Sequence, residues 1–267
     1  MNSAVVRQLL ELNRQFYERF AQPFAQTRLR IQPGVRRWLP RLLQHESLLD
    51  CGCGNGELFF ALRRAGFQGR YLGLDFSRTL LQIAAQRWAE AEKCAPSEAP
   101  FRAVDITQPQ WESSLQGETF SAITAFAVLH HLPSYRLRLQ VLRALRSLLS
   151  PGGEGLLYLS NWQFLNSLRY RQRIQPWEEV GLSAGEVEDG DYLLDWREGG
   201  RGLRYVHHFS EAELARLAEQ SGFQVIEAFY SDGREGNLAV YQLWRAEESQ
   251  PESEPDGRGG PEGNATP

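Results

Sequence analysis

An acid and three glycines at alternate positions form the stretch of this chain best suited to chemistry. Asp50 ends an apolar run, and Gly52, Gly54 and Gly56 follow it. The pattern predicts a buried strand ending in a tight turn, because glycine lets a ligand lie against bare backbone and adopts positive φ easily. The acid suits an ammonium group and would repel a pyrophosphate, and a dinucleotide-binding pattern needs a glycine where Glu57 stands. For this run taken alone, a glycine-rich turn without a ligand is the alternative.

Two further acids end apolar runs downstream. Asp75 closes the run that begins at Tyr71, at roughly the spacing that a βαβ unit gives to a ribose-binding acid. Its carboxylate can accept hydrogen bonds from both ribose hydroxyls, each worth roughly 1.5–3 kcal/mol. Capping of the helix that begins near Ser77 is the alternative role of Asp75. Asp105 ends the third run, so all three acids follow strands.

Alternating strands and helices must bring these acids together. Apolar periodicity and turn residues predict a strand before Asp50, helix 57–65, strand 71–75, helix 82–93, strands 101–106 and 120–126, a helix over 137–149, strand 155–159, helix 210–220, and strands 223–228 and 238–244. Two helices, 3–20 and 35–43, precede them, and the first is expected across the top of the cofactor pocket. This order predicts an α/β fold with a doubly wound, seven-stranded Rossmann-like sheet.

The stretch 161–203 breaks this alternation. It contains four aromatic residues and then an acid- and glycine-rich segment, and we interpret it as an inserted substrate lid. The predicted organisation is one domain over 1–245, with a cofactor-binding core over 44–160. Residues 246–267 are rich in Pro, Glu, Gly and Ser, so we expect a disordered acidic tail.

Composition limits the function further. The three cysteines give neither a disulfide framework nor metal-ligand spacing, so we expect no metal site. No apolar run approaches the roughly 18 residues of a membrane span, and the start lacks a signal pattern, so a cytoplasmic location is the default. The net charge of −4 does not indicate a nucleic-acid binder. Without the tail, however, the chain is near neutral, with arginine clusters over 28–41 and 169–173.

The spacing Asp-x-Gly-x-Gly-x-Gly resembles motif I of the class I S-adenosylmethionine-dependent methyltransferases. In that family an acid after the third strand bonds the adenine amino group. The resemblance implies S-adenosyl-L-methionine as the cofactor. The cofactor-binding residues that it implies are Asp50, Gly52, Cys53, Gly54, Gly56, Asp75, Phe76, Asp105, Ile106 and Phe126.

Segments outside the core resemble the eukaryotic tRNA wobble-uridine methyltransferases, which methyl-esterify 5-carboxymethyluridine. The resemblance covers residues 15–245 discontinuously, and its more specific pieces are the Thr-Arg that ends at Arg28 and the Arg-Tyr-x-His that begins at Arg204. The chain departs from the family where Val206 replaces a tyrosine and where Ala25 precedes Gln26. Because the eukaryotic enzymes work with a small zinc-containing activator subunit, tRNA and such a subunit are candidate partners.

A carboxylate acceptor is already ionised at pH 7 and needs no general base, but it needs a cation to orient it. A bidentate arginine suits this task, and Arg28 and Arg204 lie in the two family-like segments. His131, beyond the fourth strand, is expected to position the acceptor or contact uracil, with Tyr205 and His207 in support. The alternatives are a loop-capping His131, a surface ion pair of Arg204 with Glu198 or Asp195, and a core position for Tyr205.

Two other functions remain open at this point. One is a methyltransferase that acts on a small-molecule acceptor, with the insertion closing over it. The other is a non-catalytic S-adenosylmethionine-binding subunit that activates a partner. The intact acids and glycines of the motifs favour an enzyme over this second alternative.

Overall fold

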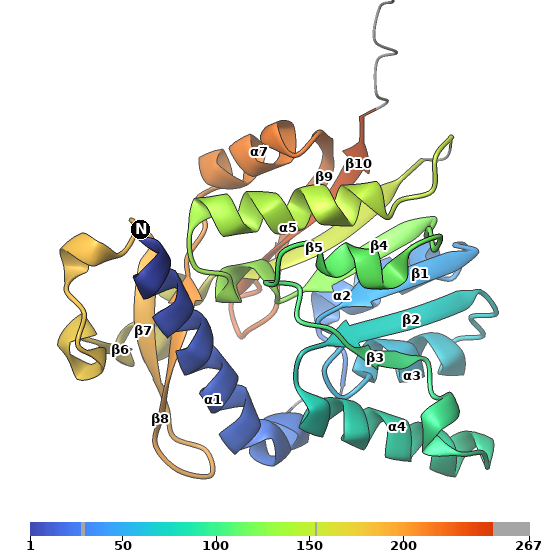
Figure 1. Cartoon of the computed structure of the whole chain (residues 1–267), viewed down its shortest axis with the longest axis horizontal. Helices are drawn as coiled ribbons and strands as arrows, with labels where there is room; N and C mark the ends of the chain where they lie inside the picture. The colour runs from blue at the N-terminus through green and yellow to red at the C-terminus, as the bar shows by residue number, and fades with distance from the viewer. Residues whose placement is uncertain (28–29, 153, 248–267) are drawn as a thin grey trace, which may run out of the picture.

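A computed structural model describes residues 1–27, 30–152 and 154–247, and a seven-stranded sheet lies at its centre (Figure 1). The strands are β1 (Ser47–Cys51), β2 (Arg70–Asp75), β3 (Phe101–Ala103), β4 (Ala122–Phe126), β5 (Leu156–Trp162), β9 (Phe223–Ser231) and β10 (Ala239–Ala246). Their order is β3-β2-β1-β4-β5-β10-β9, and β10 runs antiparallel to both of its neighbours. The predicted doubly wound Rossmann-like sheet is therefore confirmed.

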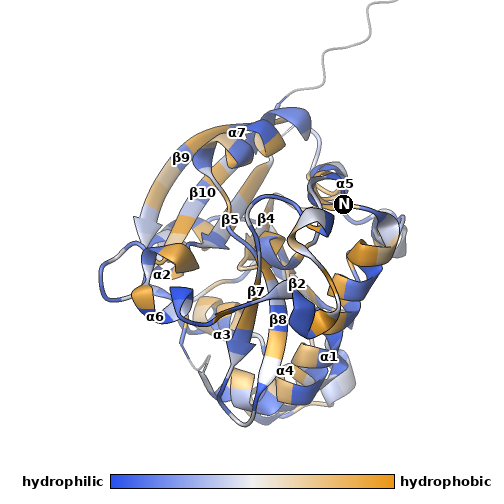
Figure 2. Ribbon diagram, turned by 90° about the vertical axis from the view of Figure 1, so that its left-hand side faces the viewer, coloured by the Kyte–Doolittle hydropathy of each residue, from blue (hydrophilic) through white to orange (hydrophobic). Residues whose placement is uncertain are grey.

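Helices cover both faces of the sheet because its strands are apolar on both sides. Along β5, Leu157 and Leu159 pack under α5 (Tyr135–Ser147) and α7 (Glu211–Gln220), whereas Tyr158 packs under α2 (Pro33–Leu42) and α3 (Glu57–Arg64). This alternation follows from the two-residue period of a strand. Figure 2 shows hydrophobic and hydrophilic residues alternating along the covering helices, as expected for helices with one buried face.

The main elements begin and end close to their predicted bounds, and the differences have local causes. Helix α4 (Arg78–Glu92) starts four residues earlier than predicted, because the Ser77 hydroxyl accepts a hydrogen bond from Leu80 N at 3.3 Å and caps it. Strand β5 continues to Trp162, three residues past its predicted end, because Ala239 of β10 pairs with it there.

The first helix, α1 (Ser3–Thr27), is seven residues longer than predicted. Its backbone leaves helical geometry at Phe20, and Pro23 lies in the part that follows. Phe20 and Ala25 are nevertheless buried, in a cluster with Leu80 of α4 and a tryptophan of the insertion. Tertiary packing therefore holds the second part of the helix in place, where local sequence predicted a loop.

The inserted segment forms a second sheet, with strands β6 (Ile174–Gln175), β7 (Asp191–Trp196) and β8 (Gly202–His207) in antiparallel order. A short helix, α6 (Leu168–Arg171), precedes them. The structure moves both predicted ends of the segment: residues 161–162 belong to β5, and the last inserted strand ends at His207 instead of residue 203. Helix α1 runs beside β8, and Figure 1 shows the second sheet flanking the main one.

Two sequence predictions fall on residues that the structure does not describe. Arg28 lies in the gap at 28–29, and the predicted tail lies outside the described residues from 248 onward. Within the described ranges, no helix combines the length and the apolar character needed to cross a membrane.

Candidate active site

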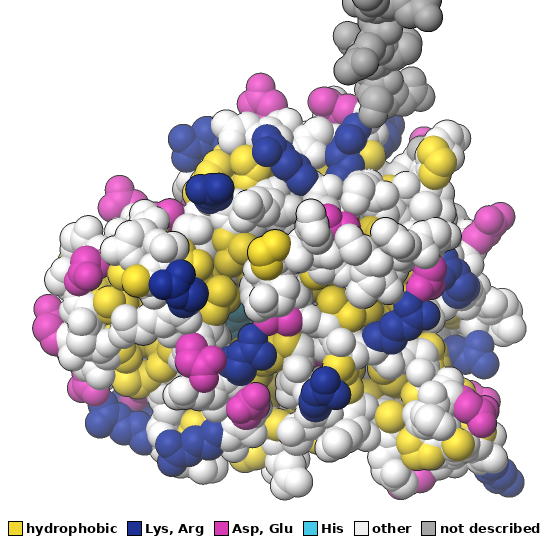
Figure 3. Space-filling model, in the orientation of Figure 1, with side chains coloured by type: hydrophobic (Ala, Val, Ile, Leu, Met, Phe, Trp, Pro, Cys, Tyr) yellow, Lys and Arg dark blue, Asp and Glu magenta, His cyan; other side chains and the backbone are white. Residues whose placement is uncertain are grey.

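A cavity of about 620 Å³ opens at the carboxyl ends of the parallel strands. Residues at or just after the carboxyl ends of β1, β2, β4 and β5 line one side of the cavity, and one face of α1 lines the opposite side. In doubly wound sheets this edge, where the strand order reverses between β1 and β4, is the usual ligand site. Figure 3 shows a histidine side chain deep in the hollow beside α1, on a face where acidic and basic side chains are mixed.

The turn after β1 exposes bare backbone to the cavity. Gly52 and Gly54 have φ values of +75° and +55°, in the left-handed region that favours glycine. A Cβ on Gly52 would lie 2.5 Å from Cγ2 of Val128, whereas a Cβ on Gly54 would meet nothing within 4 Å. Gly54 therefore presents its backbone to open space in the cavity wall, as a closely approaching ligand requires.

Gly56 differs from the other two glycines of the motif, because it does not belong to the cavity wall that the structure describes. A Cβ there would lie 3.0 Å from Phe101 and 3.3 Å from Ala84. Gly56 also has a φ of +78°, so the described structure gives it a conformational and packing role at the start of α3, and cofactor binding by Gly56 stays a prediction.

Asp75 joins the glycine turn to the next helix. Its carboxylate accepts hydrogen bonds from Gly54 N at 2.9 Å and from Ser77 N at 2.8 Å. The side chain lines the cavity, and burial raises its pKa to about 6 although these backbone bonds oppose the shift. The carboxylate is thus fixed in position with acceptor capacity left for a ligand.

Asp50 lies deeper, at the end of β1. It accepts hydrogen bonds from the Tyr71 hydroxyl at 2.6 Å and the Thr124 hydroxyl at 2.7 Å, and burial raises its pKa to about 6. Two neighbouring carboxylates with raised pKa values make this end of the cavity suited to a cationic group, in agreement with the sequence argument for an ammonium.

Asp105 is held more completely than the sequence suggested. It accepts bonds from Thr107 N at 3.0 Å, the Thr107 hydroxyl at 2.6 Å, Gln108 at 3.0 Å and Arg14 at 2.6 Å. Burial alone would raise the pKa of Asp105, but these hydrogen bonds outweigh it and lower the pKa. Because a carboxylate has about four acceptor positions, an adenine amino group would have to replace one of these donors.

The remaining predicted cofactor-binding residues all line the cavity. They are Cys53, Phe76, Ile106 and Phe126.

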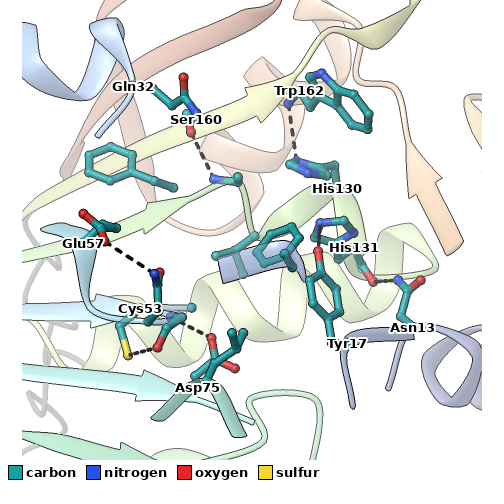
Figure 4. A pocket seen from close by; sticks show the side chains of 18 of the residues that line it. Asn13, Tyr17, Gln32, Cys53, Glu57, Asp75, His130, His131, Ser160 and Trp162 are labelled. Carbon is teal, nitrogen blue, oxygen red and sulfur yellow. Dashed lines mark hydrogen bonds between the residues drawn. The ribbon is translucent and has the colours of Figure 1, made fainter. Parts of the chain in front are cut away.

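Helix α1 fixes the position of His131 through two side chains one turn apart, which sequence reasoning did not single out as site residues. Asn13 donates to the carbonyl of His131 at 3.2 Å and exchanges two further bonds with the backbone of Tyr205, at 2.8 and 3.1 Å. The Tyr17 hydroxyl lies 2.8 Å from Nε2 of His131 (Figure 4). The sequence signals were polar groups at i and i+4 on an otherwise apolar helix face and the place of Tyr17 in the segment that resembles the tRNA methyltransferases.

Arg204 lines the cavity with its guanidinium among aromatic rings. The Cζ atom lies 4.9 Å from the ring centroid of Trp162, 5.4 Å from that of Phe16 and 5.5 Å from that of Trp196. The side chain is buried, whereas a surface ion pair would leave it exposed, so the alternative of a surface ion pair is wrong. Arg204 therefore brings a buried cation to the cavity wall.

Tyr205 and His207 do not belong to the cavity wall within the described ranges, so the structure does not bring them together with Arg204 and His131, and their support of the acceptor stays a prediction. The Tyr205 hydroxyl bonds to Asp191 at 2.6 Å, and the His207 ring lies between Asp191 at 2.7 Å and Glu213 at 2.9 Å. Both side chains are almost fully buried. The cause is strand alternation, since odd positions of β8 face away from the side that carries Arg204.

The mouth of the cavity is formed by the insertion and the end of β5. Trp162, Arg169, Tyr170 and Arg173 line it, whereas Arg171, from the same predicted arginine cluster, does not. Trp162 also donates its backbone N–H to Nδ1 of His130 at 3.3 Å, which ties this wall to the loop after β4 (Figure 4). The structure therefore divides the cluster into two arginines at the site and one outside it.

Comparison with known proteins agrees with this geometry. Residues 23–228 match the family described as a methyltransferase domain. A protein of Encephalitozoon cuniculi named as a methyltransferase is 28% identical over 213 residues, which cover 79% of this chain and 87% of that protein. A crystal structure of magnesium protoporphyrin IX methyltransferase from Synechocystis with bound SAH superposes with a TM-score of 0.58. That match has 18% identity and covers 89% of this chain and 99% of that one.

Two further relatives differ in what they methylate. The tRNA (carboxymethyluridine(34)-5-O)-methyltransferase of Xenopus tropicalis is 29% identical over 143 residues, or 54% of this chain. This chain spans only 20% of the length of that protein. The ubiquinone biosynthesis O-methyltransferase of Bordetella avium is 28% identical over 198 residues, covering 73% of this chain and 70% of that protein.

The cavity also fits the cofactor that this family uses, because it combines bare backbone at Gly54 with a fixed carboxylate at Asp75. The chain therefore belongs to the methyltransferase domain family and is an S-adenosylmethionine-dependent methyltransferase.

Proposed function

We propose that this enzyme esterifies the carboxymethyl group of a modified wobble uridine in tRNA. The observation that carries the proposal is Arg204, a buried guanidinium held by three aromatic rings in the cavity wall. A guanidinium binds a carboxylate through two parallel hydrogen bonds, and burial strengthens that interaction. The similarity to the Xenopus enzyme, whose name specifies carboxymethyluridine, supports the same acceptor.

When bound, S-adenosylmethionine would supply a methyl group from its sulfonium: the acceptor oxygen would bond to the methyl carbon as the carbon–sulfur bond breaks, and S-adenosylhomocysteine would leave with the electron pair. The residues of this chain have to bind and orient. Asp75 would hold the ribose hydroxyls, and the turn at Gly52 and Gly54 would receive the cofactor against its backbone. Arg204 would hold the acceptor carboxylate so that one oxygen faces the methyl group.

Positioning of this kind can supply on the order of 7–11 kcal/mol of a barrier. A carboxylate is ionised at pH 7, so the reaction needs no group that removes a proton. His131 would then act by orienting the acceptor, with its own backbone and imidazole held by Asn13 and Tyr17.

The test uses methyl-labelled S-adenosylmethionine with total tRNA and, separately, a small-molecule extract, both from cells that lack this protein. Label in tRNA that nuclease digests and mild alkali releases would be a methyl ester and would support the proposal. Label confined to small molecules would refute it.

The second candidate is a methyltransferase for a small metabolite. The similarity to the Bordetella enzyme, whose name specifies ubiquinone biosynthesis, favours it. The enclosing insertion fits this function as well, because it could cover a small acceptor completely. The same labelling experiment separates the two functions.

A third arm of the labelling experiment adds a small activator subunit to the tRNA reaction and measures whether methyl transfer depends on it.

A further inference from the structure

Three guanidinium groups and two aromatic rings form a continuous series along one wall of the cavity. Starting from Arg204, the next group is Trp162, with 4.9 Å between Cζ and ring centroid, and then Tyr170, whose ring centroid lies 4.7 Å from that of Trp162. Arg169 and Arg173 follow, with Cζ atoms 5.7 and 5.9 Å from the Tyr170 centroid. All five residues line the cavity, and we call this series the arginine–aromatic ladder.

The ladder runs from the interior to the solvent. Arg204 is buried, Trp162, Tyr170 and Arg173 are half-buried, and Arg169 is exposed. A carboxylate bound at Arg204 would occupy only the inner end. The outer residues of the ladder, Arg169, Tyr170 and Arg173, therefore offer an aromatic ring and two cations. These groups would contact a second part of the same acceptor, one that extends out of the cavity.

The local backbone explains why two of the three neighbouring arginines, Arg169 and Arg173, line the cavity. Helix α6 is a single turn, and Arg173 N extends it by donating to the carbonyl of Tyr170 at 2.9 Å. Arg169 and Arg173 are four residues apart and share a side of this turn, whereas Arg171 points elsewhere and does not line the cavity.

We propose that Arg169, Tyr170 and Arg173 form an outer subsite for single-stranded RNA, in which one base lies on Tyr170 and adjacent phosphates pair with the two guanidinium groups. The inference rests on the proposed function for the identity of the acceptor. Stacking of a base on an aromatic side chain beside arginines is how proteins hold single strands without reading their sequence. Arginine also matches the geometry of a phosphate, which makes it suited to the outer positions.

A free metabolite would make a different demand on this wall. The carboxylate of a metabolite without phosphate groups would need Arg204 alone. The outer cations suit an acceptor that carries further negative charge at a fixed distance from the reacting group, as a polynucleotide does.

The experiment measures binding of a fluorescent short oligouridine to the full chain by anisotropy at several salt concentrations, without methyl transfer. We compare Arg169→Ala and Arg173→Ala with Arg171→Ala, which removes the same charge from the same turn outside the cavity. Each phosphate contact with a single strand contributes about 0.7 to the slope of log K against log salt. We expect the slope to fall by about 0.7 in each of the first two variants and to stay unchanged in the third.

Tyr170→Leu and Tyr170→Phe test whether a base stacks on the ring of Tyr170. The leucine variant should bind oligouridine roughly tenfold more weakly at every salt concentration, with its slope unchanged, and the phenylalanine variant should restore binding. Equal slopes in all three arginine variants would overturn the subsite, as would equal binding by the two tyrosine variants.

Methyl transfer to tRNA from cells that lack this protein separates the two proposals. Wild-type enzyme that binds oligouridine with the expected slopes but methylates no tRNA would contradict the proposed function and leave the subsite standing. Transfer to tRNA with equal slopes in the three arginine variants would contradict the subsite alone.

Discussion

The part of the cavity around Asp75, where we propose that the cofactor binds, and the part around Arg204, where we propose that the acceptor binds, are built in different ways, and we call them the cofactor half and the acceptor half. In the cofactor half, Asp75 binds Gly54 and Ser77 through their backbone N–H groups. Gly54 and Asp75 lie within one strand–turn–helix–strand unit, and Ser77 follows that unit directly. In the acceptor half, Arg204 of β8 is held by rings from α1, β5 and β7. One half depends on backbone conformation close in sequence, and the other on side chains from distant segments.

The difference indicates which parts can change independently. A turn that binds a ligand through its backbone tolerates few substitutions, because the exposed glycine backbone is the binding surface and its positive φ values favour glycine. A wall made of side chains on a separate small sheet can change its acceptor while the cofactor half stays the same. The predictions below test whether the two halves are separable, and they run from the largest expected effect to the smallest.

Asp75→Ala should weaken S-adenosylmethionine binding by about 100-fold or more, because two charge-assisted hydrogen bonds worth roughly 1.5–3 kcal/mol each are lost. Titration calorimetry measures this affinity. The matched control is Asp191→Ala. Asp191 is similarly buried and also accepts bonds from a backbone N–H, at Glu188, and from the hydroxyl of Tyr205, but it does not line the described cavity. Equal losses of affinity in the two variants would show that Asp75 only stabilises the fold.

Arg204→Ala should spare cofactor binding and lower kcat/KM for the acceptor by roughly 100-fold, since a buried bidentate carboxylate contact is lost. Arg204→Lys should recover only part of this activity, because an ammonium keeps the charge but neither the planar fork nor the stacking on Trp162. Unchanged turnover in the alanine variant would remove Arg204 from the site. A lower affinity for the cofactor would show that the two halves are not separable.

Cofactor affinity should rise roughly tenfold between pH 5 and pH 7, because a carboxyl with a pKa of about 6 is mostly protonated at the first value and mostly ionised at the second. The effect on stability has the opposite sign. The pKa of Asp75 is raised from 3.8 to about 6, so between these two pH values the folded chain still binds a proton that the unfolded chain has released. Protonated Asp75 therefore contributes to the free energy of unfolding at low pH, and this contribution is lost as the pH rises from 3.8 to about 6.

The pH dependence of the dissociation constant checks this prediction. Asp50 also titrates at about pH 6, so Asp75→Asn should remove part of the dependence and the double variant with Asp50→Asn should remove the rest. An affinity that does not change between pH 5 and pH 7 in the wild type would contradict it.

Tyr17→Phe should lower methyl transfer by about fivefold, since one hydrogen bond of roughly 1 kcal/mol that orients His131 is lost. Cofactor affinity should stay unchanged. Tyr158→Phe is the control, because its hydroxyl makes a similar bond to Nε2 of His45 at 2.9 Å, away from the cavity wall. Equal activity of the two variants would mean that the bond between Tyr17 and His131 has no role in transfer.

The sequence alone determined the doubly wound, seven-stranded sheet and the positions of the glycine turn and the acids beside it. Asp50, Gly52, Gly54 and Asp75 could be placed because each belongs to a short segment whose local pattern sets both its conformation and its neighbours. The packing of Gly56 could not be placed in this way, because its neighbour Phe101 lies 45 residues further along the printed sequence.

Only the tertiary structure decided the acceptor half. The sequence marked residues 204–207 as one motif, yet strand alternation turns Arg204 to the cavity and buries Tyr205 and His207 against Asp191. Asn13 acquires its role only when α1, β8 and the loop after β4 meet. Contacts between side chains so far apart in sequence have no local signature, because burial and packing, not backbone propensity, fix them.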